Sequence, residues 1–198
     1  MAPERSSPPE AKPLRLFVAV DVPQEVKREL EARVAGFRER VAVARWTRPD
    51  GWHVTLKFLG STWPRLVDQV RRAVAETASE ASPFDSALTE LGVFASPRRA
   101  RVIWVGLDDP DQRLAAIARD LDRRLEDHFV PEKRELNPHL TLARLNPPRD
   151  IREFAPDLVG AAVGSERFRV GELVLYRSRL SPTGARYEPL ERFALGSS

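Results

Sequence analysis

Residues 51–60 read Gly51-Trp52-His53-Val54-Thr55-Leu56-Lys57-Phe58-Leu59-Gly60, and the centre of this segment, His-Val-Thr-Leu at 53–56, returns as His-Leu-Thr-Leu at 139–142. This repeat is the strongest indication of the fold. The chain of 198 residues has three histidines, so two of the three lie in one repeated motif. Glycine or proline flanks each copy, and branched or aromatic residues fill it, which is typical of a β-strand between turns. We therefore expect two related strands, one in each half of the chain.

Alternation along these strands predicts a cleft with acid–base chemistry. Successive side chains of a strand point to opposite faces, so the histidine and threonine of each copy share one face and the apolar residues share the other. Two such units facing each other would combine two imidazoles with two hydroxyls, from His53, Thr55, His139 and Thr141. Imidazole exchanges protons near neutral pH, so this pattern suggests catalysis.

The rest of the chain predicts an α+β fold in which the second half roughly echoes the first. Residues 1–13 are polar and proline-rich and are expected to be a disordered tail. No linker separates the halves, so we expect one packed unit over 14–198. Strands are predicted at 14–21, 45–47, 52–59, 84–94, 101–107, from 139 to about 144, 165–180 and 186–195, and helices at 23–40, 64–79 and 111–129.

Composition excludes several classes of function. The chain has no cysteine, which rules out disulfides, thiolate metal sites and a cysteine nucleophile, and which favours a cytoplasmic location. No apolar run approaches the length of a membrane span, so we expect no membrane association. The net charge of +3 is carried mostly by arginine, which permits a nucleic-acid partner without requiring one.

With their flanking segments, the two motifs resemble the two-histidine (2H) phosphoesterases, and among these the RNA 2′,3′-cyclic phosphodiesterases, also called bacterial and archaeal 2′-5′ RNA ligases. The resemblance covers nearly all of the chain after the tail. It departs from the pattern at Gly51-Trp52 and at Leu136, outside the catalytic pairs. The segments that carry it are 15–21 (RLFVAVD), 53–60 (HVTLKFLG), 101–106 (RVIWVG), 138–144 (PHLTLAR), 175–178 (LYRS) and 186–190 (RYEPL).

This resemblance implies a bilobal fold with two pseudo-twofold-related antiparallel-sheet lobes, helices on the outer faces and the active site in the central cleft. It implies that His53 donates a proton to the leaving group and that His139 accepts one from water, although the residues alone do not assign these roles. Thr55 and Thr141 would donate to the phosphoryl oxygens. The scheme requires no metal and no cofactor.

Arg144 and Phe58 each lie five residues after a motif histidine, so alternation alone would place them on the opposite face. Arg144 reaches phosphate only if the strand ends or bends nearby, which Asn146-Pro147-Pro148 allows; the alternative is a surface ion pair. By resemblance Phe58 stacks on a base, and the alternative is a core aromatic.

Other residues have weaker signals. Tyr187 and Ser178 lie in family-like segments and are candidates to line the cleft. The tryptophans Trp46 and Trp52 either stack on a base or lie in the interior. Arg98 and Arg99 either contact RNA backbone or lie in a solvated loop, and we expect His128 to be a surface or capping residue.

The function implied is metal-independent hydrolysis of RNA 2′,3′-cyclic phosphate ends to 2′-phosphates, with reversible 2′-5′ RNA ligation as a further activity of the same site. One alternative is another small cyclic nucleotide as substrate, and a second is an RNA-binding module without catalysis. A zinc site is a third alternative, but it would want a further protein ligand that the motifs do not supply. We expect a monomer whose partner is RNA or a nucleotide with a 2′,3′-cyclic phosphate.

Overall fold

The structure, a computed structural model, describes residues 12–181 and 184–196. The predicted tail at 1–13 therefore lies almost entirely outside the described residues. The first half of the chain forms β1 (Leu14–Asp21), α1 (Gln24–Arg40), β2 (Arg45–Trp46), β3 (His53–Thr62) and α2 (Pro64–Glu80). The second half forms β4 (Phe84–Ser86), β5 (Leu88–Phe94), β6 (Ala100–Leu107), α3 (Arg113–Leu125), β7 (His139–Arg149), β8 (Phe168–Val170), β9 (Glu172–Ser181) and β10 (Gly184–Ala194).

The motif strands lie side by side at the centre of an antiparallel sheet. Within the described residues the strand order is β10-β9-β1-β3-β7-β6-β5, with β2 added beside β7, and β4 pairs with β8 in a separate small sheet. The two halves of the large sheet meet only where Val54 of β3 pairs with Leu140 of β7. The expected α+β fold with two lobes is confirmed, and this is the one pair by which the described strands β3 and β7 join the two halves of the sheet.

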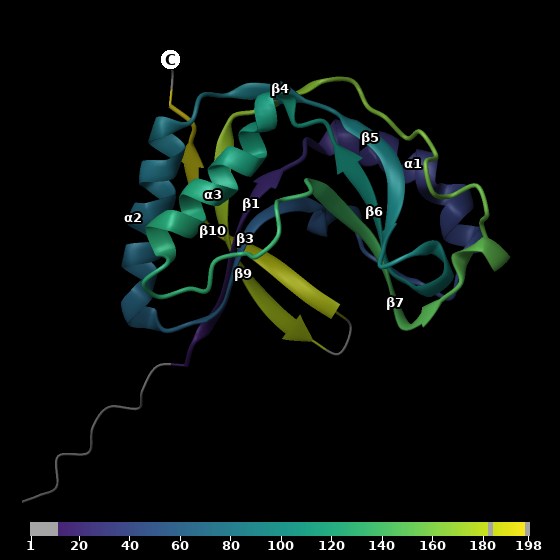
Figure 1. The fold of residues 1–198 in the computed structure, drawn as a ribbon, viewed down its shortest axis with the longest axis horizontal. Helices are drawn as coiled ribbons and strands as arrows, with labels where there is room; N and C mark the ends of the chain where they lie inside the picture. The colour runs from purple at the N-terminus through teal and green to yellow at the C-terminus, as the bar shows by residue number, and fades with distance from the viewer. Residues whose placement is uncertain (1–11, 182–183, 197–198) are drawn as a thin grey trace, which may run out of the picture.

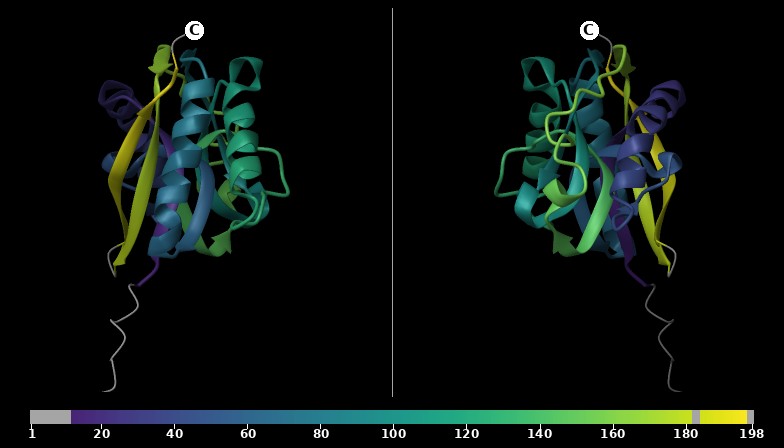
Figure 2. Two further views of the ribbon diagram at one scale, coloured as in Figure 1. Left: turned by 90° about the vertical axis from the view of Figure 1, so that its left-hand side faces the viewer. Right: turned by 90° about the vertical axis from the view of Figure 1, so that its right-hand side faces the viewer.

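Each helix buries an apolar stripe against the sheet. Figure 1 shows α2 and α3 side by side on the half that holds β1, β3, β9 and β10, while α1 lies at the other end of the molecule. The side views of Figure 2 show α1 and the α2–α3 pair on different sides of the strands. In α3 the stripe is Leu114, Ile117, Leu121 and Leu125, which recur at the spacing of one helical face.

Two predicted boundaries are wrong for local reasons. The third helix begins at Arg113 rather than at residue 111, because Asp111 and Gln112 have positive φ angles of 56° and 54° and interrupt the helix. Asp109 instead accepts hydrogen bonds from the first backbone amides, Leu114 N at 2.7 Å and Ala115 N at 3.2 Å. The same helix ends at Leu125, before the predicted residue 129.

The second motif strand continues to Arg149, beyond the point near Arg144 where the pattern loosens. Pro147 and Pro148 fall between the register pairs Val102↔Arg144 and Ala100↔Arg149. Neither proline is a register partner in that ladder, so their missing N–H groups do not break it. The predicted strands at 84–94 and 165–180 are each divided in two, as β4 with β5 and β8 with β9.

We predict that the contact between the lobes carries a large share of stability. Leu140 at the junction is fully buried, whereas Leu180 near the end of β9 is 72% exposed. Leu140→Ala should lower the free energy of unfolding in urea by about 3 kcal/mol, since it removes buried methyl groups and leaves a cavity. The matched Leu180→Ala should change it by less than about 0.5 kcal/mol. Equal effects of the two substitutions would contradict this assignment of the junction.

Candidate active site

The junction between the lobes places both motifs on one face of the sheet. In β3, Val54 and Leu56 are buried while His53 and Thr55 are only partly covered, and β7 repeats this alternation residue for residue. Because the strands are antiparallel and Val54 pairs with Leu140, the register sets His53 opposite Thr141 and Thr55 opposite His139. The two copies are thus related by a local twofold axis through that pair.

A β-bulge in each motif strand returns a further side chain to this face. In β3, Thr55 pairs with Ala19 and Lys57 with Val18, which leaves Leu56 as the extra residue. In β7, Thr141 pairs with Trp104 and Ala143 with Ile103, which leaves Leu142 as its counterpart. An extra residue reverses the alternation beyond it. Phe58 and Arg144 therefore lie on the face of the histidines, although alternation alone places them opposite.

This finding corrects the explanation that the sequence suggested for Arg144. The bulge at Leu142 brings it to the site, not an end or bend of the strand at Asn146-Pro147-Pro148. The core alternative for Phe58 is wrong as well, because 58% of this residue is exposed.

Hydrogen bonds hold the bulge in β7. The carbonyl of Leu142 accepts from the backbone N of Thr47 at 2.8 Å and from Thr47 Oγ1 at 2.9 Å. Trp52 Nε1 in turn donates to Thr47 Oγ1 at 2.8 Å. Trp52 is 1% exposed, so it is a core residue that supports the site, and the idea that it stacks on a base is wrong.

Aromatic side chains enclose His53. Its ring stacks on Phe17 with a centroid distance of 4.8 Å, and Tyr187 meets it edge-on at 4.8 Å. Burial lowers the pKa of His53 to about 4, and Lys27 and Arg144 add to this effect. A hydrogen bond with the backbone of Gly51 and the charge of Asp21 oppose it only partly. The imidazole is therefore neutral at neutral pH.

His139 occupies the equivalent position in the other lobe. Phe94 meets its ring edge-on with a centroid distance of 5.0 Å, and the centroid of the Trp104 ring lies 6.2 Å from that of His139. Nδ1 lies 2.7 Å from the carbonyl oxygen of Asn137, and a carbonyl can only accept, so Nδ1 carries the hydrogen. Burial lowers the pKa of His139, and Arg144 lowers it further. The neutral ring then has Nε2 as its proton-accepting atom.

The polar groups between the histidines are unpaired within the described part of the chain. Arg144 is exposed, acts on the pKa of both imidazoles, and has no carboxylate partner among the described residues. The Thr55 and Thr141 hydroxyls make no hydrogen bond to any other described residue. One cation, two free hydroxyls and two neutral imidazoles together form a site suited to a small anion whose bonds are to be broken by proton transfer.

Tyr187 and Ser178, both candidates from the sequence, pair across β9 and β10. The structure places Tyr187 against His53. Tyr176 stacks on Phe17 and donates from its hydroxyl to Asp21 Oδ1 at 2.6 Å. The sequence did not single out four aromatic residues around the histidines: Phe17, Phe94, Trp104 and Tyr176. These four residues lie in predicted strands that consist mainly of apolar residues. The sequence pattern therefore does not distinguish aromatic residues of the site from aromatic residues of the core.

Of the remaining candidates, Trp46 pairs with Ala143 just beyond the second motif, and the others lie outside the motif strands. Trp46 donates from Nε1 to the carbonyl of Val41 at 3.1 Å and packs partly against the core. His128 is exposed beyond the end of α3, as expected of a surface residue. Arg98 and Arg99 are exposed in a short turn of 3₁₀-helix before β6.

The described residues offer neither a metal site nor a membrane-spanning helix. Among residues 12–181 and 184–196 no cluster of three or more His, Asp or Glu side chains is arranged to hold a metal ion. No helix in the same part of the chain is long and apolar enough to cross a membrane.

Comparison with known proteins gives consistent matches. The model of the LigT like phosphoesterase family matches residues 20–104 and again residues 105–187. An RNA 2′,3′-cyclic phosphodiesterase of Methanothermobacter thermautotrophicus is 32% identical over 190 residues, which cover 92% of this chain and 99% of that protein. The protein of the same name from Thermotoga maritima is 27% identical, covering 89% of this chain and 93% of its own.

Solved structures agree with these matches. A protein of Thermus thermophilus superimposes with a TM-score of 0.80 at 26% identity and covers 93% of this chain and 99% of its own. The structure of E. coli LigT complexed with phosphate superimposes with a TM-score of 0.71 at 25% identity, and the match covers 94% of this chain and 100% of that protein. The family model matches one motif strand in each of its two segments, as the twofold relation of the site requires. This chain therefore belongs to the LigT like phosphoesterase family.

Proposed function

We propose that this protein hydrolyses 2′,3′-cyclic phosphate ends of RNA to 2′-phosphates without a metal ion. The observation that carries the proposal is Arg144, unpaired among the described residues, on the same face as two partly buried, neutral imidazoles and two free threonine hydroxyls. The activity for which several relatives are named, over most of the chain, supports the same reaction.

The reaction needs one proton removed and one supplied. Water attacks phosphorus and gives a proton to Nε2 of His139, while the bond from phosphorus to the ribose O3′ breaks. The protonated ring of His53 gives its proton to the departing O3′, which leaves a free 3′-hydroxyl and a 2′-phosphate. These roles follow the family pattern. Joining of ends through a 2′-5′ linkage would place an RNA 5′-hydroxyl where water attacks and would use the same two proton transfers, whereas cleavage of that linkage back to the cyclic phosphate would exchange the two roles.

The neighbouring groups stabilise charge and hold the nucleotide. The hydroxyls of Thr55 and Thr141 donate to the non-bridging oxygens, and Arg144 supplies a positive charge where negative charge accumulates. Phe58 offers an exposed ring for a base, and Tyr187 shapes the wall beside His53. Fixing these donors before the substrate binds avoids reorganisation during the reaction.

Burial of the imidazoles has a consequence for proton supply. With the pKa of both rings lowered, the free enzyme holds few protons in this cleft at pH 7. A phosphodiester anion bound between the rings favours their charged forms and raises both pKa values. The substrate therefore helps to recruit the proton that its own leaving group requires.

Removal of either motif histidine should abolish turnover. We expect His53→Ala and His139→Ala each to lower kcat on a short RNA with a 2′,3′-cyclic phosphate by at least about 100-fold, because each loses one proton transfer. The matched control is Val159→Ala, which alters an exposed side chain in a turn away from both motif strands and should retain wild-type activity. Phosphorus NMR in excess EDTA should show a 2′-phosphate product from the wild type.

Loss of activity in EDTA that zinc restores would contradict the metal-free scheme. Near-normal turnover by either motif variant would contradict the two-histidine mechanism.

The pH profile should be displaced towards acid. The quantity kcat/KM reports the free enzyme, in which one ring must be protonated and the other neutral, whichever ring holds the proton. Both pKa values lie below the usual 6.5. Thus kcat/KM should peak below pH 6.5 and fall about tenfold per pH unit above the higher pKa.

Arg144→Gln should move this profile to higher pH, since the arginine charge lowers both pKa values. It should also reduce kcat/KM at the optimum by about tenfold or more through loss of the phosphate contact. If kcat/KM of the wild type peaks above pH 7, the histidine pKa values are not lowered. If Arg144→Gln leaves the pH optimum unchanged, the arginine charge does not contribute to lowering them.

A further inference from the structure

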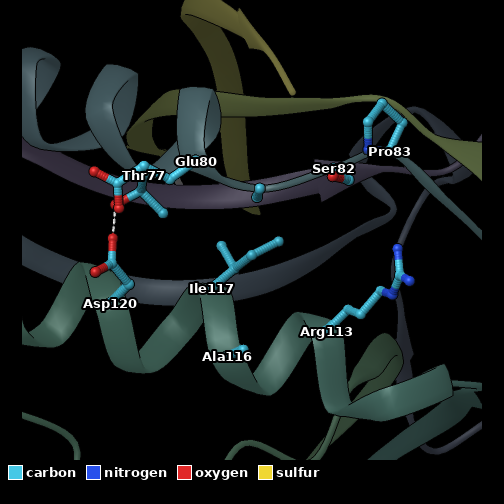
Figure 3. A pocket seen from close by; sticks show the side chains of 9 residues that line it. Thr77, Glu80, Ser82, Pro83, Arg113, Ala116, Ile117 and Asp120 are labelled. Carbon is cyan, nitrogen blue, oxygen red and sulfur yellow. Dashed lines mark hydrogen bonds between the residues drawn. The ribbon is translucent and has the colours of Figure 1, made fainter. Parts of the chain in front are cut away.

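Two hollows in the described part of the chain are lined by residues other than the motif histidines. One, of about 520 Å³, lies between α2 and α3, where Thr77 donates to Asp120 at 2.6 Å (Figure 3). None of the residues of the catalytic face lines it. The second, of about 870 Å³, contains Phe58 and therefore begins on the catalytic face itself. We call the second hollow the β3 groove; it is lined by residues 58–61, 63, 66 and 128–134.

The β3 groove follows an edge that the fold leaves open. Strand β3 pairs with β1 along its length but with β7 only at Val54, so beyond the bulge at Leu56 its other edge pairs with no described strand. The loop between α3 and β7 passes along this edge (Figure 1).

A buried ion pair fixes that loop. Lys57 is 1% exposed, donates to the carbonyl of Val130 at 2.8 Å and pairs with Asp122 of α3. The other carboxylate oxygen of Asp122 accepts from the backbone N of Glu132 at 3.1 Å. The loop that forms one wall of the groove is therefore held in place through Lys57, the residue before Phe58. The groove has a defined shape because this wall is fixed.

The lining combines exposed aromatic rings with unpaired positive charge. Phe58 is 58% and Trp63 36% exposed, and the guanidinium of Arg65 lies 5.8 Å from the centre of the Trp63 ring. Lys133 and Arg134 have no carboxylate partner within the described residues, and Glu132 is the one acidic residue of the lining. Aromatic platforms beside cations are the chemistry that binds single-stranded nucleic acid.

Resting on the proposed function, we propose that the β3 groove binds the single-stranded RNA that precedes the terminal cyclic phosphate. Phe58 stacks on the terminal base, Trp63 on a base further along the strand, and Lys133 and Arg134 contact the intervening phosphates. The enzyme would then select RNA ends over free cyclic nucleotides, because a mononucleotide leaves most of the groove empty.

The test compares two substrates, adenosine 2′,3′-cyclic phosphate and an oligoadenylate hexamer that ends in the same group. For the wild type we expect kcat/KM to be at least about tenfold higher for the hexamer. Trp63→Ala and the double variant Lys133→Ala/Arg134→Ala should each reduce this hexamer-to-mononucleotide ratio about five- to tenfold. The double variant alters only exposed side chains, so a folding defect of the Trp63 variant would not obscure the result.

The matched control is Arg98→Ala/Arg99→Ala, which removes two exposed cations from the turn before β6 and should keep the wild-type ratio. A ratio that falls in this control rather than in the groove variants would show that the RNA leaves the site by another route. An unchanged ratio in both groove variants would equally overturn the proposal.

A binding measurement separates this proposal from the proposed function. Fluorescence anisotropy in EDTA, with a labelled hexamer ending in a 2′-phosphate, should give about five- to tenfold weaker binding for each groove variant. The salt dependence should become shallower by about 0.7 per lost phosphate contact. If the wild type hydrolyses neither substrate, the proposed function fails while weaker binding by the variants still supports the groove. Equal binding by wild type and variants overturns the groove whatever the catalytic result.

Discussion

The pairing of Val54 with Leu140 sets the geometry of the whole site. Among the described residues it is the one register pair between β3 and β7, and it fixes which faces of these two motif strands point the same way. Side chains alternate with a period of two, so a slip of one residue in either strand would turn a histidine and its threonine into the core. Burial of Val54 and Leu140, and of Leu56 and Leu142 beyond them, makes such a slip costly. The catalytic geometry is thus secured by apolar residues on the far side of the sheet.

The same burial sets the electrostatics of the cleft. Rings packed around His53 and His139 remove water, and this lowers both pKa values, while Arg144 adds a charge that the described residues do not neutralise. Within the described residues no carboxylate pairs with Arg144, and the threonine hydroxyls have no acceptor. These hydrogen-bond donors therefore lack partners until an anion binds in the cleft. Affinity for the substrate and the tuning of proton transfer therefore have one physical origin.

Much of this could be read from the sequence, since strand alternation and helical spacing depend on local residue types. The repeated motif, the strand at residues 14–21 and the first two helices are examples. The positions of Phe58 and Arg144 could not be predicted, because each bulge depends on which residue of a neighbouring strand lies opposite. Trp52 and Phe17 illustrate a related limit: both are apolar and aromatic, yet one supports β7 from the core and the other stacks on a catalytic ring. Only tertiary packing separates these two uses.

We expect His53 and His139 to bind one phosphate together with Thr55, Thr141 and Arg144. A crystal structure with a nucleoside 2′-phosphate, the end product of the proposed reaction, would show whether they do. The phosphate should lie between the two imidazoles, with both hydroxyls and the guanidinium within hydrogen-bonding distance of its oxygens. A phosphate that contacts only one of the two rings, or that lies in the hollow between α2 and α3, would contradict this expectation.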